Sequence, residues 1–95
     1  MSLDTLLPRL ENNDEPLRAT ELIKLSRLHG ADLDRFLDTW RRVSIQRRRN
    51  VIDQLADLAE DEVEVDFNRI FLTGRFDNDG QVRADSLRAL WEYDG

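Results

Sequence analysis

The middle of the chain carries a cluster of guanidinium groups in a nine-residue stretch without any acid. Its members are Arg41, Arg42, Arg47, Arg48 and Arg49. Such a cluster at the start of a helix could bind a phosphate or another anion. Ordinary pairing along helices is the competing interpretation, because Asp38 precedes the cluster and Asp53 follows it at helical spacing. We favour a solvated, locally paired face, and an anion or nucleic-acid site remains the alternative.

A run of carboxylates of comparable size follows the arginines. It comprises Asp53, Asp57, Glu60, Asp61, Glu62, Glu64 and Asp66. The run could bind a cation or a basic partner, but a solvated helix end followed by a linker explains it more simply. The basic and acidic segments could also complement each other, either within the molecule or between molecules.

A second acidic group, Asp77-Asn78-Asp79-Gly80, invites comparison with a calcium-binding loop. With Gly80 at the sixth loop position, Asp77 and Asp79 fall at the third and fifth positions. Arg75 would then be the first ligand and Ser86 the twelfth, where carboxylates are required. We therefore expect a tight polar turn here, with neither a metal nor a cofactor.

The remaining chemistry-bearing residue types are sparse. Cysteine is absent and His29 is the single histidine, so thiolate and His-rich metal sites are excluded. His29 stands beside Gly30 and is interpreted as a turn residue. No nucleophile–base pair, glycine-rich phosphate loop or isolated carboxylate pair stands out. We expect a protein that is not an enzyme and has no catalytic residues.

Length and charge narrow the class of protein further. Ninety-five residues, 40% hydrophobic and 36% charged, are consistent with one globular domain over residues 1–95. The net charge of −6 argues against nucleic acid as the main partner. Neither a secretion signal nor a membrane-spanning run is evident, so we expect a cytoplasmic protein without a membrane partner.

The elements that would position these residues are helices, because apolar residues recur at helical spacing almost throughout. The expected helices cover residues 3–10, 17–28, 31–43, 44–59, 66–74 and 81–93. Ser44 and Asp66 are suitable N-caps, and Gly30 fits a left-handed stop. Pro8 could delay, kink or break the first helix. The alternating segment 62–67 is interpreted as a linker rather than a strand.

Short turns group these helices into three antiparallel hairpins, approximately 1–29, 31–60 and 64–93. An Arg-x3-Leu/Ile-x2-Leu pattern recurs in the second helix of each, beginning at Arg18, Arg48 and Arg83. Its third copy aligns Leu87 and Leu90 with the apolar positions of the earlier copies. Trp40 is expected in the core. Trp91, in the last helix, is expected to be partly exposed.

The segment 77–90 resembles the second half of a HEAT repeat, in which an acidic turn precedes a Val-Arg dipeptide, small residues and leucine. The matching residues are Asp77 or Asp79, Val82, Arg83, Ser86, Ala89 and Leu90. The resemblance implies an all-α fold of about six helices, with hairpins stacked as a short HEAT-like α-solenoid. It further implies that Arg83 pairs with an acid of the preceding repeat.

In function, the resemblance implies a protein-interaction or scaffold module. Its partner would be another protein or further repeats of the same protein. Neighbouring hairpins must stack to complete a core, so a Trp91 left uncovered would mark an unfinished stack. We therefore expect self-association or partner binding through the C-terminal helix.

Overall fold

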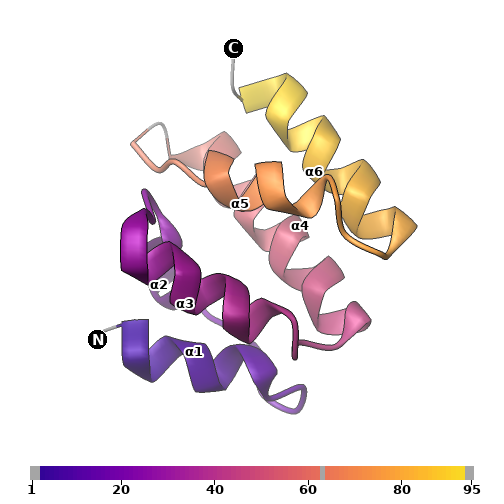
Figure 1. Ribbon diagram of the computed structural model, residues 1–95. Coiled ribbons are helices and arrows are strands. Elements are labelled where there is room, and N and C mark those ends of the chain that lie inside the picture. Colours follow the sequence, from indigo (N-terminus) through magenta and orange to yellow (C-terminus); the bar gives the residue numbers. More distant parts are fainter. Residues whose placement is uncertain (1–2, 63, 94–95) are drawn as a thin grey trace.

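Six α-helices and one short 3-10 helix form the computed structural model, which describes residues 3–62 and 64–93 (Figure 1). They are α1 (Leu3–Glu11), α2 (Ala19–Leu22), η1 (Ile23–Leu25), α3 (Gly30–Trp40), α4 (Ile45–Asp61), α5 (Asn68–Gly74) and α6 (Gly80–Tyr93). The described residues form no strand, which confirms the all-helical prediction. Within those same ranges, no helix combines the length and apolar character needed to cross a bilayer.

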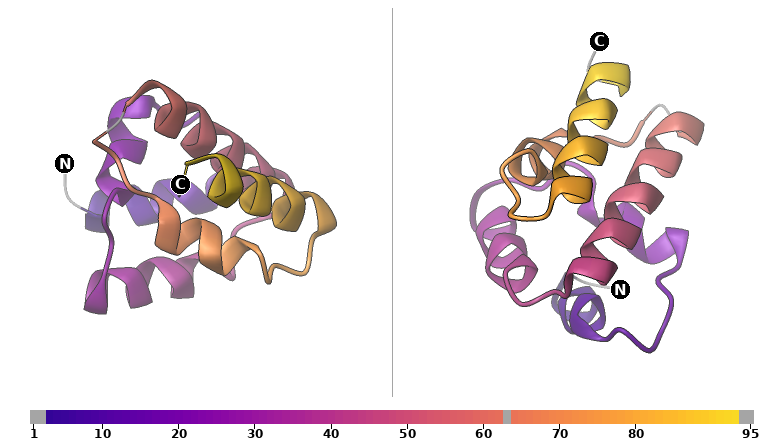
Figure 2. Two further views of the ribbon diagram at one scale, coloured as in Figure 1. Left: turned by 90° about the horizontal axis from the view of Figure 1, so that it is seen from above. Right: turned by 90° about the vertical axis from the view of Figure 1, so that its right-hand side faces the viewer.

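The helices pack in a regular order along the chain. α1 packs against α3, α2 against α4, and α6 against both α4 and α5. In the view from above, α3 and α5 lie along the lower side of the picture, and α2 and α4 lie along its upper side (Figure 2, left). The radius of gyration of 12.0 Å is close to the ~12 Å typical of a compact chain of this length.

The expected single helix over 17–28 is wrong, because helix ends early at η1. Ser26 is extended, with ψ of 134°, which stops the helix, and Arg27 after it is left-handed with φ of 61°. The linker before α5 holds this turn in place. The Arg27 amide donates to the Asp66 carbonyl oxygen at 2.7 Å, and the Asp66 amide donates to Ser26 Oγ at 2.9 Å. Gly30 does have positive φ, but it begins α3 instead of ending the helix before it.

Of the two predicted N-cap residues, Ser44 and Asp66, only Ser44 caps its helix. Ser44 Oγ accepts a hydrogen bond from the Arg47 amide at 3.2 Å, which confirms it as the N-cap of α4. Asp66 does not cap α5: Phe67 occupies that position, and Asp66 instead accepts from the Asn68 amide. Pro8 lies inside α1 without interrupting it.

The core confirms the expected position of Trp40, which is 5% exposed. The two earlier copies of the arginine pattern bury both apolar positions completely, at Leu22 and Leu25 and at Ile52 and Leu55. The equivalence fails in α6, where Leu87 is 51% exposed and Leu90 is only partly buried.

The buried stripe of α6 consists instead of Val82, Ser86 and Ala89, which recur at helical spacing. Ser86 meets Gly74 of α5, where an added Cβ atom would lie 2.1 Å from Ser86 Oγ. Small side chains therefore let α5 and α6 approach closely. The larger residues Leu87 and Trp91 lie on the exposed side of α6.

Candidate interaction surface

Arg47 extends from the first turn of α4 to the last turn of α1. Its side chain is buried, and it donates to the carbonyl oxygens of Leu10 at 3.3 Å and Arg9 at 2.8 Å. The last carbonyls of a helix have no partner within that helix. Arg47 therefore closes the end of α1, and its burial lowers the pKa of its guanidinium.

Arg48 extends from the same turn toward the polar turn before α6. Its Nη1 atom lies 2.7 and 2.8 Å from the two carboxylate oxygens of Asp77, and its Nε donates to the Val43 carbonyl oxygen. Both side chains of this pair are largely shielded from solvent, with Arg48 12% and Asp77 5% exposed. The pair joins two segments that lie 29 residues apart.

Arg49 forms the neighbouring ion pair. Its Nε and Nη2 donate to the two oxygens of Asp79 at 3.0 and 2.8 Å. The same carboxylate accepts from the Val82 amide in the first turn of α6. The guanidinium, followed by this amide, lowers the pKa of Asp79 to about 2. Asp77 and Asp79 thus serve as internal counter-ions for α4.

The expected ladder pairing of Arg83 is wrong. Arg83 donates at 2.7 Å to the main-chain oxygen of Asp77, within its own turn. Arg48 and Arg49 supply the arginine–acid contacts between segments instead. They do so because the start of α4, rather than that of α6, points its long side chains at the polar turn.

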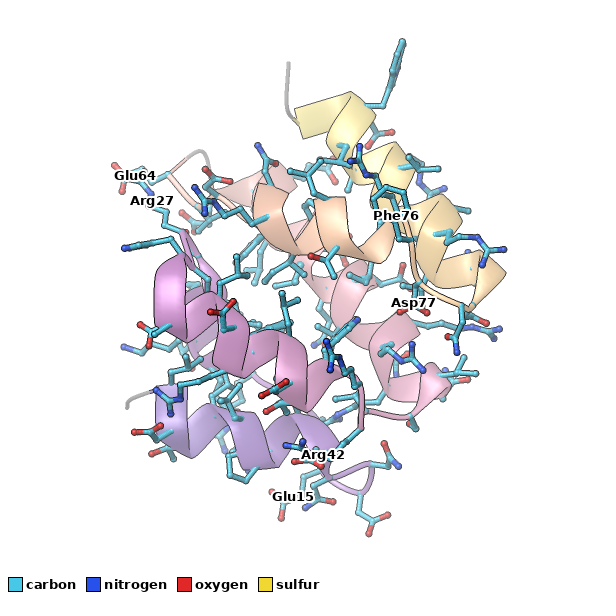
Figure 3. All side chains as sticks on the ribbon, in the orientation of Figure 1. Glu15, Arg27, Arg42, Glu64, Phe76 and Asp77 are labelled. Atoms are coloured by element: carbon cyan, nitrogen blue, oxygen red, sulfur yellow. The ribbon has the colours of Figure 1, made fainter. Side chains whose placement is uncertain are left out.

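The other two arginines of the cluster face outward. The side chain of Arg41 is 81% exposed and approaches Asp38 to 3.9 Å. Arg42 donates to a carboxylate oxygen of Glu11 at 3.0 Å and projects beside the end of α1 (Figure 3). The structure therefore divides the five arginines into three that bind internal groups and two on the surface.

All seven residues of the acidic run are exposed. Arg27 donates to the main-chain oxygen of Glu64 at 3.0 Å, and the two side chains lie close together in Figure 3. Within residues 3–62 and 64–93, no three carboxylate or imidazole groups gather as metal ligands. These positions are consistent with a solvated helix end and linker.

Large apolar side chains lie uncovered on α5, α6 and the turn between them. The exposed fraction is 87% for Trp91, 76% for Phe76, 51% for Leu87 and 40% for Leu72. We call these four residues the outer surface. The expected exposure of Trp91 is confirmed. Figure 3 shows Phe76 over the space between α5 and α6.

The sequence reading missed Phe76 and Leu72. A signal was present, because the buried stripe of α5 is formed by Phe67, Ile70 and Phe71. Position 72 lies on the opposite side of this helix, and position 76 follows the helix in the turn before α6. Large apolar residues that do not belong to the buried stripe of a helix are therefore the pattern from which the outer surface could have been predicted.

Comparison of the chain with protein-family models, with curated proteins and with solved structures finds no match. Its function must therefore be argued from the contacts and surfaces described above.

Proposed function

We propose that the chain is a short stack of helical hairpins, similar to a HEAT-like α-solenoid, that works as a protein-interaction module without catalytic activity. The observation that carries this proposal is the outer surface. Trp91 and Phe76 are both more than three-quarters exposed, and large exposed apolar side chains, carried here by α5, α6 and the turn between them, are typical of binding sites.

The packing order supports the stacked arrangement. Helices in corresponding positions of successive hairpins contact one another: α1 meets α3, α2 meets α4, and α4 meets α6. The pairs Arg48–Asp77 and Arg49–Asp79 join the second hairpin to the turn of the third. Contacts of this kind between neighbouring units are what a repeat architecture needs for a continuous core.

The two ends of the stack differ in the way an interaction role requires. On α1, the apolar residues Leu6, Leu7 and Leu10 are buried, while Asp4 and Glu11 face solvent. On α6, Leu87 and Trp91 face solvent. Among its described residues, the first hairpin exposes one large apolar side chain, Ile23 at 40%, whereas the last offers an aromatic anchor of the type enriched in binding hot spots.

Anion binding through the arginine cluster has less support as a function. Arg47, Arg48 and Arg49 are committed to carbonyl and carboxylate groups inside the molecule. Arg41 and Arg42 are the exposed members of the cluster, and Arg42 is paired with Glu11; the Arg49 side chain is 42% exposed but its Nε and Nη2 both bind Asp79. A salt-dependent gel shift still separates the two functions, since steep salt dependence would favour the anion site.

Selection from a displayed library of helical peptides tests the interaction role. Peptides that bind the wild type should lose at least about 30-fold in affinity for Trp91→Ala, the loss typical of a hot-spot residue. Ile45→Ala is the control. It removes an exposed apolar side chain from α4, where Ile45 is about as exposed as Leu72 is on the outer surface, and it should leave the affinity unchanged. Enriched peptides that bind wild type and Trp91→Ala equally would contradict the proposal.

A further inference from the structure

The carboxylates of the last hairpin turn inward. Asp77 and Asp79 pair with Arg48 and Arg49. Asp85 is 5% exposed and accepts hydrogen bonds from Gln81 at 2.9 Å and Arg88 at 2.8 Å. Of the acidic residues described between positions 68 and 93, this leaves Glu92 exposed.

The arginines of the same hairpin turn outward. Arg69, Arg75, Arg83 and Arg88 are all exposed. The Arg75 guanidinium lies 4.5 Å from the centre of the Phe76 ring, so this charge lies on the outer surface itself. Although the chain has a net charge of −6, the exposed charged residues between positions 69 and 88 are all arginines.

The apolar and basic residues of α6 alternate on one outer face. Leu87 and Trp91 are four residues apart and therefore lie one above the other. Arg83 precedes Leu87 by four residues and continues this row, whereas Arg88 follows Leu87 directly and lies beside it. This order matches a partner helix with apolar residues at spacings of three and four and acidic residues beside them.

We propose that the outer surface binds an acidic amphipathic helix of a partner protein. This inference rests on the proposed interaction function and adds the chemical class of the partner. Apolar residues of the partner would cover Phe76, Leu87 and Trp91, while its carboxylates would pair with Arg83 and Arg88. Partial removal of these pairs from water makes them stronger than pairs on an open surface.

Charge also distinguishes this partner from a second copy of the chain. A symmetric dimer through the outer surface would place the same patch against itself. Arg75, Arg83 and Arg88 would then face like charges, which is unfavourable. An acidic helix covers the same apolar residues without that repulsion.

Calorimetry with the full chain and three designed peptides tests the proposal. The first is a helix with leucines at i, i+3, i+4 and i+7 and glutamates elsewhere; the second replaces the glutamates with lysine, and the third with glutamine. We expect the glutamate peptide to bind at least about tenfold more tightly than the others, and this advantage to shrink from 50 to 500 mM salt. Trp91 fluorescence should shift to shorter wavelength on binding, because the indole leaves water.

A charge-matched pair of variants supplies the control. Arg83→Glu/Arg88→Glu should reduce affinity for the glutamate peptide at least about tenfold and improve affinity for the lysine peptide. Lys24→Glu/Arg41→Glu makes the same change in net charge on exposed positions outside the outer surface and should leave both affinities unchanged. Circular dichroism of all variants establishes that they remain folded.

Each other outcome has a definite meaning. Binding of all three peptides with equal affinity, abolished by Trp91→Ala, would overturn the acidic partner but keep the interaction function. Binding of none would overturn both. Dimerisation of the free chain that disappears in Trp91→Ala, measured by light scattering, would replace the acidic helix with a second copy.

Discussion

Asp79 combines two roles in one carboxylate, since it pairs with Arg49 and accepts from the Val82 amide. Its pKa in the folded chain is about 2, below the ordinary 3.8. A lowered pKa means that the charged form stabilises the fold above about pH 4, and that this stabilisation is lost as pH falls toward 2. We expect Asp79→Asn to lower the thermal midpoint at pH 7 by roughly 5 °C, because the amide retains the cap but not the charge.

The pH dependence of this difference identifies its cause. Thermal midpoints of wild type and Asp79→Asn should converge between pH 4 and pH 2. Asp34→Asn, on an exposed position of α3, provides the control and should show little difference at any pH. A gap between wild type and Asp79→Asn that stays constant down to pH 2 would rule out the ion pair as its source.

Gly74 and Ser86 form the tightest contact between α5 and α6. Gly74→Ala would place a Cβ atom 2.1 Å from Ser86 Oγ. We expect it to destabilise the chain by about 1–3 kcal/mol, as measured by urea unfolding. Gly80→Ala is the matched control, because its added Cβ would meet its nearest neighbour, Arg83, at an ordinary 3.5 Å. Equal effects of the two alanines would show that the close approach does not limit stability.

At the scale of the helices, Arg47 makes the start of α4 the cap of α1. Arg47→Met keeps much of the side-chain volume but leaves the buried Leu10 carbonyl without this donor, while the Arg9 carbonyl still accepts from the Asn12 amide at 3.2 Å. Since a buried polar group without a partner costs about 1–3 kcal/mol, we expect unfolding free energy to fall by about 2 kcal/mol. Arg41→Met, on an exposed arginine of the same cluster, should change it little. An equal loss in both variants would indicate a general effect of removing arginine.

Helix periodicity predicted the elements more reliably than their ends. Both core positions of the first two arginine patterns are buried, as the repeat required. The end of the second helix could not be predicted, because the turn of Ser26 and Arg27 that stops it is held by Asp66, 40 residues from Ser26. A left-handed arginine has no local sequence signature comparable to that of glycine.

For the whole molecule, the sequence predicted which residues form charged clusters but not which way they face. Arg47 and Arg41 belong to one cluster, yet one is buried and the other is exposed. Their directions depend on how α1 and the polar turn pack around α4. The outer surface was found only in part for a related reason. Trp91 was predictable from its place in the last helix, whereas Phe76 follows a helix whose buried face is already complete.

The first turn of α4 has a consequence for how the chain opens. Within five residues, Ser44 donates to Asn13, Arg47 to Arg9 and Arg48 to Asp77. Segments from both halves of the chain are thus fastened to one short stretch of backbone. The two halves should therefore lose protection against amide hydrogen exchange together, as a single cooperative unit, instead of melting one after the other. A chain built of short helices would in this way avoid the half-open forms that expose apolar surface.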